Sequence, residues 1–267
     1  MTPPLKWHGG KHYLAAHIHK LASQTTYTHR VITHGGGAAE LWDWPYQGIS
    51  EVLNDINGDL TNFWRVLASK EQFPIFLRQV QATPFSQIEW RNAKATLPNT
   101  QDPVSRAVLF FILCRQSMAG RMQSFSPISR TRTRRGMNEQ VSSWLTAIDG
   151  LPQVHARLSR ILILNDDAIS VIRSQDSPQT LFYCDPPYHP DTRTSPNVYT
   201  HELTPTEHRR LLNIANRITG KMIISHYRHP LYDKLLSNWN CLTISLPNNA
   251  ASGRTKRRMT ECLYYNF

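Results

Sequence analysis

The chain has 267 residues, and its 30 Lys and Arg against 19 Asp and Glu give a formal net charge of +11 and a pI near 9.8. This excess of positive charge favours a polyanionic partner, above all nucleic acid, and the length allows one α/β domain with a smaller second lobe. The longest apolar run, residues 107–114, is far shorter than the roughly 20 residues of a membrane helix, and no signal-peptide pattern opens the sequence, so we expect a soluble, cytoplasmic protein with no membrane partner.

Apolar runs bounded by turn residues predict seven strands, with helical patterns between most of them. The strands are expected at residues 29–33, 49–54, 160–164, 180–184, 221–225, 241–246 and 259–267. The helices are expected at residues 13–23, 58–69, 168–174, 206–219 and 230–236. This alternation is typical of βαβ units, so we predict an α/β fold with a seven-stranded, mostly parallel sheet and helices on both faces.

The alternation stops between residues 54 and 160, where helices are predicted at residues 72–81, 87–96, 103–116 and 139–148. A hundred residues of helix joined by polar connections is typical of a separate lobe. We therefore predict one domain from residues 1–69 and 150–267, with a helical domain of residues 70–149 inserted into it.

Cysteine and histidine spacing argues against a metal centre. His8 with His12, and His226 with His229, have helix-compatible spacing, but no acidic or thiol partner follows at the spacing of a metal site. The cysteines are widely spaced and include no C-x-x-C pair, so we expect them to be reduced and structural rather than part of a disulfide framework or zinc ribbon. They are Cys114, Cys184, Cys241 and Cys262.

The most informative motif follows the predicted strand 180–184 directly. It is Asp185-Pro186-Pro187-Tyr188, in which two prolines end the strand and an acid and an aromatic stand at its carboxyl end. Open α/β sheets bind ligands at this end of their strands. The alternative is a Pro-Pro turn after a core strand.

Two glycine-rich segments precede predicted helices. In the first, Lys6-Trp7-His8-Gly9-Gly10-Lys11, paired glycines allow a ligand to approach the backbone at a helix amino end. In the second, Gly35-Gly36-Gly37-Ala38 follows the first strand, and Asp55 lies twenty residues beyond Gly35 at the end of the second. This arrangement is typical of a nucleoside cofactor site, with the acid on the ribose. The alternative is a structural turn followed by a helix cap at Asn57.

A third segment, Asn165-Asp166-Asp167-Ala168, joins the strand 160–164 to the next helix. An acid at this position can accept a hydrogen bond from the exocyclic amine of an adenine. An Asp at a helix start is more often an N-cap, which is the favoured interpretation of this segment taken alone.

Residues 103–138 contain seven arginines and no acid. Residues 124–136 are also rich in Ser and Thr and have no helical period, so they are interpreted as a mobile loop that contacts phosphates or guanine edges, or as a solvated basic loop. A second basic cluster, Arg254, Lys256, Arg257 and Arg258, precedes the last strand and is interpreted as a phosphate clamp or as protection of a sheet edge. The seven arginines are Arg106, Arg115, Arg121, Arg130, Arg132, Arg134 and Arg135.

Taken in order, these segments resemble the adenine-specific DNA methyltransferase family that includes the Dam methylases, over nearly the whole chain. The resemblance implies the Rossmann-like fold of S-adenosylmethionine-dependent methyltransferases, with one antiparallel strand near the carboxyl end and a helical target-recognition lobe inserted after the second strand. The residues that carry it are Leu5-Lys6-Trp7-His8-Gly9-Gly10-Lys11, Gly35-Gly36-Gly37-Ala38, Asn54-Asp55-Ile56-Asn57-Gly58-Asp59-Leu60, Asp167-Ala168, Tyr183-Cys184-Asp185-Pro186-Pro187-Tyr188 and Glu261-Cys262-Leu263-Tyr264-Tyr265-Asn266-Phe267.

The resemblance also implies roles for individual residues. Asp185 and the Pro186 carbonyl would accept hydrogen bonds from the amine of a flipped adenine, beside Pro187, and Tyr188 would stack on the base. The residues expected to bind S-adenosyl-L-methionine are Trp7, Gly10, Lys11, Gly35, Gly37, Asp55, Asp167 and Ala168. The residues expected to face double-stranded DNA are Lys6, Arg121, Arg130, Arg132, Arg134, Arg135 and Asn138. A monomer is expected, with a cognate restriction enzyme as a possible partner.

One departure from the family pattern stands before the glycine turn. Ile32-Thr33-His34 replaces the usual Glu-Pro-Phe, so an acid and an aromatic are lost from the rim of the cofactor site. The activity predicted is methylation of adenine N6. Methylation of cytosine N4 is a close alternative, although an acid rather than a serine before Pro-Pro-Tyr favours adenine. A catalytically silent DNA-binding protein is another alternative, supported by the departure at residues 32–34.

Overall fold

A computed structural model describes residues 1–7, 9–44, 48–126, 129–193, 201–247 and 258–267. The chain forms two compact units, each treated separately below. Unit 1 comprises Met1–Ala15, Gly36–Tyr46 and Asn57–Asn165, and unit 2 comprises Ala16–Gly35, Gln47–Ile56 and Asp166–Phe267. The predicted inserted domain, residues 70–149, falls within unit 1, and its boundaries stay a prediction.

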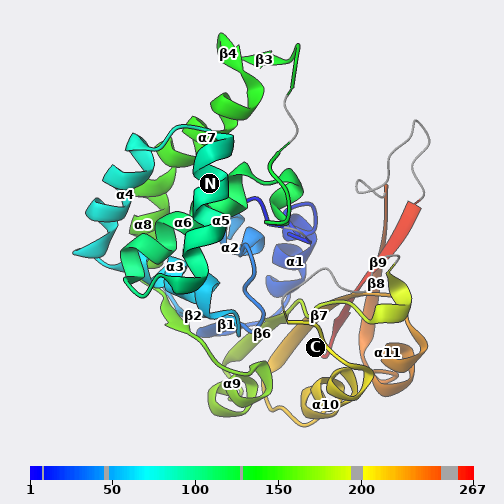
Figure 1. The fold of residues 1–267 in the computed structure, drawn as a ribbon. Coiled ribbons are helices and arrows are strands. Elements are labelled where there is room, and N and C mark those ends of the chain that lie inside the picture. Colours follow the sequence, from blue (N-terminus) through cyan, green and yellow to red (C-terminus); the bar gives the residue numbers. More distant parts are fainter. Residues whose placement is uncertain (8, 45–47, 127–128, 194–200, 248–257) are drawn as a thin grey trace. The chain divides into compact units, whose positions relative to one another are not determined.

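All seven predicted strands form one sheet, in the order β5-β2-β1-β6-β7-β9-β8 (Figure 1). The pairs β1–β2, β1–β6 and β6–β7 are parallel, whereas β9 runs antiparallel to β7 and β8. The expectation of a mostly parallel sheet with one antiparallel strand near the carboxyl end is confirmed. The strands are β1 (His29–Ile32), β2 (Ser50–Asn54), β5 (Leu162–Leu164), β6 (Thr180–Cys184), β7 (Lys221–Tyr227), β8 (Asn240–Pro247) and β9 (Arg258–Tyr265).

The strand order reverses direction between β1 and β6. From β1 the chain first builds outward through β2 to β5, and then returns to the other side of β1 to add β6 and β7. In open α/β sheets, such a reversal leaves a crevice at the carboxyl ends of the two central strands, because the connections on either side leave in opposite directions. The residues after β1 and β6 therefore stand where this fold binds ligands.

The centre of the sheet is buried. Every residue of β6 is buried, as expected for a central strand with an unbroken apolar run. The neighbouring strands β1 and β2 carry one cross-strand ion pair, between Arg30 and Glu51, whose side chains are almost fully buried. The two charges compensate each other, which a buried charge requires.

Helices α9 (Ala168–Gln175), α10 (Pro205–Ala215) and α11 (Pro230–Leu235) lie on one side of the sheet of unit 2, and α1 (Ala15–Ala22) lies on the other (Figure 1). A capping box between Thr204 and Glu207 begins α10, with Pro205 in the first turn. The predicted helix 206–219 ends early, at Ala215. The backbone N–H groups of Thr219 and Gly220 donate instead to Asp176, which holds a turn there.

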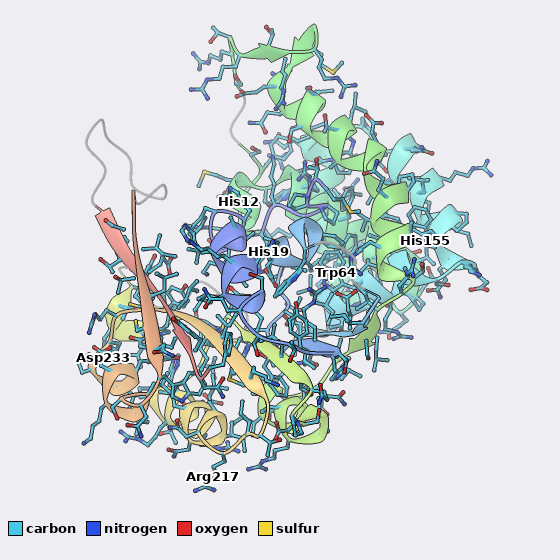
Figure 2. The ribbon with its side chains drawn as sticks, turned by 180° about the vertical axis from the view of Figure 1, so that it is seen from behind. His12, His19, Trp64, His155, Arg217 and Asp233 are labelled. Atoms are coloured by element: carbon cyan, nitrogen blue, oxygen red, sulfur yellow. The ribbon has the colours of Figure 1, made fainter. Side chains whose placement is uncertain are left out.

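Unit 1 is mainly helical, and α6 packs against α3, α4 and α5. Phe63 and Trp64 of α3, Phe76 of α4 and Phe111 of α6 are completely buried and make up the aromatic core (Trp64 is labelled in Figure 2). In the described part of the chain, none of the helices has the length and apolarity needed to cross a membrane. The helices are α2 (Ala39–Asp43), α3 (Gly58–Ala68), α4 (Gln72–Ala82), α5 (Gln87–Thr96), α6 (Pro103–Gln116), α7 (Glu139–Asp149) and α8 (Leu151–Leu158), with 3-10 turns η1 (Leu97–Asn99) and η2 (Met118–Gly120).

The prediction that residues 124–136 form a loop is wrong at its carboxyl end. Strands β3 (Thr133–Arg134) and β4 (Met137–Asn138) form a hairpin directly before α7 (Figure 1). Both turn residues, Arg135 and Gly136, have positive φ, of 57° and 73°. This is the conformation of the tight two-residue hairpin turn, for which Asn-Gly is the usual sequence signal. The sequence here is Arg-Gly, which lacks that signal and therefore does not predict a hairpin.

Candidate active site

The Asp185 side chain lies at the carboxyl end of β6, where the strand order reverses, and it is held by a serine of the neighbouring strand. Ser225 Oγ on β7 donates a hydrogen bond of 2.6 Å to Asp185 Oδ1. The hydroxyl of Tyr183 lies 3.1 Å from the same Ser225 Oγ. The Asp185 carboxylate is half-buried, whereas Tyr183 and Ser225 are fully buried. The orientation of this carboxylate is therefore set by groups that solvent does not reach.

Tyr188, the last residue of the same motif, is held by its hydroxyl. It donates a hydrogen bond of 2.6 Å to Oε2 of Glu261, a buried residue of β9. Its ring packs edge-on against Tyr227, with 4.6 Å between ring centroids. It also packs against the tilted ring of His226, with 4.7 Å between centroids. Of the two prolines between, the first is buried and the second half-buried. Asp185 to Tyr188 thus form one compact structure at the end of β6.

The ends of β1 and β2 are joined through Gly35 and Asn54. The backbone N–H of Gly35 donates to Asn54 O at 2.7 Å. A Cβ atom at Gly35 would lie 2.8 Å from Leu53 Cδ1, which is closer than such atoms approach. Gly35 is therefore required by packing against β2, as the alternative of a structural turn predicts. Asp55 follows directly and is half-buried, and its contact with a ribose stays a prediction.

Two helix caps predicted from the sequence are confirmed. Asp167 Oδ2 accepts hydrogen bonds from the backbone N–H groups of Ile169 and Ser170, so this residue caps α9, which begins at Ala168. Asn57 caps α3 in the same way. Asp167 is exposed, and its role toward a cofactor stays a prediction.

His34 stands where the family pattern has an aromatic residue. Its Nδ1 lies 3.0 Å from Thr33 Oγ1 and 3.5 Å from Cys184 Sγ. Burial lowers the pKa of His34 below the ordinary value for histidine. The imidazole is accordingly neutral at pH 7, and it links the end of β1 to the end of β6.

The remaining predicted cofactor residues belong to unit 1, where Trp7 packs on the glycine turn. A Cβ atom at Gly36 would lie 2.7 Å from Trp7 Nε1, and one at Gly37 would lie 2.5 Å from Trp7 Cβ. Gly36 also has a positive φ of 48°. These two glycines are therefore needed to accommodate the Trp7 ring.

The segment after Trp7 is a tight turn. The N–H of Gly10 donates to Trp7 O at 3.2 Å, and the buried Lys11 Nζ donates to Gly9 O at 2.8 Å. His8, whose spacing from His12 is helix-compatible, lies outside the described residues. In unit 1 the structure brings together four of the eight predicted cofactor residues: Trp7, Gly10, Lys11 and Gly37.

Lys6 lies in an unusual electrostatic setting. Burial, together with the nearby Arg115, lowers the pKa of Lys6 to about 8, although Cys114 and Glu139 act in the opposite direction. Its carbonyl accepts a hydrogen bond from Cys114 Sγ at 3.0 Å. Gly120 of η2 packs so closely on that carbonyl that a Cβ atom there would lie 1.7 Å from Lys6 O.

The arginines of residues 103–138 fall into three groups, according to how their side chains are held. Arg106 binds Asp59 at 2.5 Å and Arg115 donates to Ser143 O at 2.7 Å, so these two stabilise unit 1 internally. Among the residues that the structure describes, Arg121, Arg130 and Arg134 form no ion pair or side-chain hydrogen bond.

Arg132 and Arg135 are anchored weakly to α7. Arg132 lies 4.0 Å from Glu139, while Arg135 donates to Thr146 Oγ1 at 3.0 Å and lies 3.7 Å from Asp149. Asn138, also predicted to face DNA, accepts from the N–H of Gln140 and so caps α7. Arg254, Lys256 and Arg257 of the second basic cluster lie outside the described residues.

A cluster of His189, Asp191 and His229 places three potential metal ligands within 4.8 Å of one another. Residue spacing does not predict this cluster, because the acid precedes His229 by 38 positions rather than following it. However, His229 Nδ1 accepts from the N–H of Leu231 at 3.2 Å, which leaves the proton on Nε2, facing the Asp191 carboxylate. A metal on Nε2 would require that proton on Nδ1 instead. We therefore assign this cluster no metal.

Comparison with known proteins agrees with this geometry. Residues 7–248 match the model of the D12 class N6 adenine-specific DNA methyltransferase family. The chain is also 27% identical over 236 residues to the DNA N-6-adenine-methyltransferase of Escherichia phage P1. That alignment covers 84% of this chain but 30% of the phage protein, so the chain spans about a third of the length of this relative. Because the family match extends over most of the sequence, the chain belongs to the D12 class N6 adenine-specific DNA methyltransferase family.

Proposed function

We propose that this protein transfers a methyl group from S-adenosylmethionine to N6 of an adenine in double-stranded DNA. The observation that carries the proposal is the Asp185 carboxylate, held by Ser225 at 2.6 Å beside the point where the strand order of the sheet reverses. Membership of the family and the excess of positive charge, +11 overall, support DNA as the substrate.

The chemistry explains why such a carboxylate is needed. The lone pair of an exocyclic amine is delocalised into the ring, so the amine is a poor nucleophile. Two acceptors, the Asp185 carboxylate and the Pro186 carbonyl, would bind its two N–H groups and direct the lone pair toward the methyl donor. The amine loses its proton after the attack, so a strong general base is not required. Reaching this amine requires the base to leave the duplex, and Tyr188 would stack on it.

The hydrogen-bond acceptors at the carboxyl ends of the strands fit S-adenosylmethionine, which would supply an electrophilic sulfonium methyl group. Asp55 and Asp167 offer carboxylate oxygens of the kind that accept from ribose hydroxyls and an adenine amine, and both are at least partly exposed. Gly35 allows the β1 turn to lie against β2 beside them. The other residues proposed to bind S-adenosylmethionine belong to unit 1 and are Trp7, Gly10, Lys11 and Gly37.

DNA contacts are proposed for six basic residues and one asparagine of unit 1. The hairpin β3–β4 and the residues leading to it carry four of these arginines, with side chains long enough to reach phosphates or base edges. The residues proposed to contact DNA are Lys6, Arg121, Arg130, Arg132, Arg134, Arg135 and Asn138. A monomeric state, a cytoplasmic location and a cognate restriction enzyme stay predictions.

The test is transfer of labelled methyl from S-adenosylmethionine to unmethylated duplex DNA, followed by digestion to nucleosides. Label in N6-methyladenine is the expected result. Label in N4-methylcytosine would replace the proposal by the close alternative, since a cytosine amine presents the same chemical problem. DNA binding without any transfer would overturn the proposal in favour of a silent DNA-binding protein.

A further inference from the structure

We propose that Ser225 of β7 and Glu261 of β9 are positioning residues, which hold Asp185 and Tyr188 in the conformation that methyl transfer needs. The inference rests on the function proposed above. It arises from two short hydrogen bonds, each of 2.6 Å, that connect the motif to buried side chains of two adjacent strands.

The donor and acceptor roles around Ser225 follow from its single proton. A carboxylate only accepts, so in the contact with Asp185 the proton belongs to Ser225. Tyr183 must then be the donor in its 3.1 Å contact with Ser225 Oγ. The result is a directed chain from Tyr183 through Ser225 to Asp185. Since Tyr183 and Ser225 are completely buried within β6 and β7, the chain fixes the carboxylate on a rigid support.

Glu261 acts on the other end of the motif. Its side chain is buried, with 2% of its surface exposed, and it lies opposite Tyr227 in the register of β7 and β9. A carboxylate at this depth is costly unless it accepts hydrogen bonds, and the Tyr188 hydroxyl supplies one. The bond sets the rotation of the Tyr188 ring, which Tyr227 then supports at its edge.

The backbone that follows the motif is held by β7, the strand that contains Ser225. His226 Nδ1 lies 2.6 Å from the Tyr227 carbonyl, so this nitrogen carries the proton. The lone pair on Nε2 then accepts the backbone N–H of His189 at 2.8 Å. The ring stacks on Tyr232, with 3.8 Å between centroids. Pro186 and Pro187 restrict the backbone between these anchors, so both ends of the motif and both side chains are held.

The test compares Ser225→Ala and Glu261→Gln with two matched controls. Ser142→Ala removes a buried hydroxyl that has no hydrogen-bond partner in the described structure, and Tyr264→Phe removes a tyrosine hydroxyl from β9 whose partner is Asp233. The measurements are the single-turnover rate of methyl transfer at saturating S-adenosylmethionine and DNA, and the Kd of each. We expect the rate to fall about ten- to hundred-fold in the two positioning variants, with each Kd changed less than about three-fold, and controls near the parent.

Two further variants separate positioning from general stability. Ser225→Thr keeps the hydroxyl and should recover most of the rate. Tyr188→Phe removes one oxygen atom, and combining it with Glu261→Gln should cost no more than the worse of the two single changes, since both remove the same bond. If Ser225→Ala does not fold, the inference is tested by comparing the rates of Tyr188→Phe, Glu261→Gln and the double variant.

Unchanged rates in Ser225→Ala and Glu261→Gln would overturn the inference and leave the proposed function standing. It would equally be overturned by additive losses in the double variant, or by a fall in rate that merely follows loss of folded protein. Absence of transfer by the parent protein is a separate outcome, because it overturns the proposed function itself together with the catalytic role assigned to these residues.

Discussion

Asn54 and Asp166 exchange two hydrogen bonds through the side-chain amide of Asn54. Its Nδ2 donates to Asp166 O and its Oδ1 accepts the N–H of Asp166, both at 3.0 Å. Nδ2 also donates to Thr33 O at 2.9 Å. One fully buried amide at the end of β2 thereby joins the end of β1 to the segment that starts α9.

Asn54→Ala should lower the free energy of unfolding by about 1–3 kcal/mol, because it removes the partner of the buried Thr33 carbonyl and two hydrogen bonds to the Asp166 backbone. Urea denaturation provides the measurement. Asn240→Ala is the matched control, since that amide is exposed and donates to Phe267 O, and it should cost at most about 0.5 kcal/mol. Equal losses in the two variants would show that the shared amide of Asn54 is not a structural junction.

Gly120→Ala should lower the free energy of unfolding much more than Gly136→Ala, although the φ angles of the two glycines are alike, at 70° and 73°. A Cβ at Gly136 would meet nothing within 4 Å, so only the left-handed backbone is penalised, by about 1–2 kcal/mol. At Gly120 it would lie 1.7 Å from Lys6 O, which forces η2 away from Lys6. We therefore expect Gly120→Ala to lower the free energy of unfolding by more than about 4 kcal/mol. Similar denaturation midpoints for both variants would contradict the packing of Gly120 on Lys6.

Acid should destabilise unit 2 through buried histidines. Burial lowers their pKa values below 6.5, to about 4 for His208. Between these values the unfolded chain binds more protons, so the free energy of unfolding falls as the pH falls below about 6.5, by up to about 1.4 kcal/mol per pH unit for each histidine. Denaturation at pH 7.5, 6.5 and 5.5 measures the slope, and His208→Gln should reduce it. A stability independent of pH in this range would refute the prediction. The histidines concerned are His34, His189, His208 and His226.

Asp185→Ala should lower the rate of methyl transfer at least about 100-fold while DNA binding stays nearly unchanged, because the carboxylate is proposed to act on the amine and not on the phosphates. Transfer assays and DNA titration supply the two readouts. Asp233→Ala removes a half-buried carboxylate of α11 that binds Arg228 and Tyr264; it is labelled in Figure 2, serves as the control and should keep the parental rate. An Asp185→Ala variant as active as the parent would eliminate the mechanism.

Arg132→Ala with Arg134→Ala should weaken DNA binding at every sequence. The slope of log K against log salt should become shallower by about 1.8, if each arginine neutralises one phosphate. The control removes two exposed arginines from unit 2, Arg209 and Arg217, the latter labelled at the periphery in Figure 2. The same slope in the parent and the Arg132/Arg134 variant would exclude both residues from the DNA interface.

Local sequence pattern determined the strands and most of the helices. Residues 180–184 form an unbroken apolar run between polar turns and fold as β6 with those bounds, and helices α5 and α6 also begin and end as predicted. For residues 139–158, the pattern predicts only one of the two helices. The helix predicted there, 139–148, covers α7 but not α8, which begins immediately after Gly150. Periodicity identifies a helix from its own residues, but it does not place a break that depends on packing.

The motif Asp185 to Tyr188 could be found from the sequence because its residues are adjacent. The residues that hold it could not. Ser225 lies 40 positions from Asp185, and Glu261 lies 73 positions from Tyr188. In the sequence one is the end of an apolar run and the other is an acid within a strand, and neither pattern indicates a partner. Only the order β6-β7-β9 in the sheet brings them together, because hydrogen bonds between side chains depend on distance in space and not along the chain.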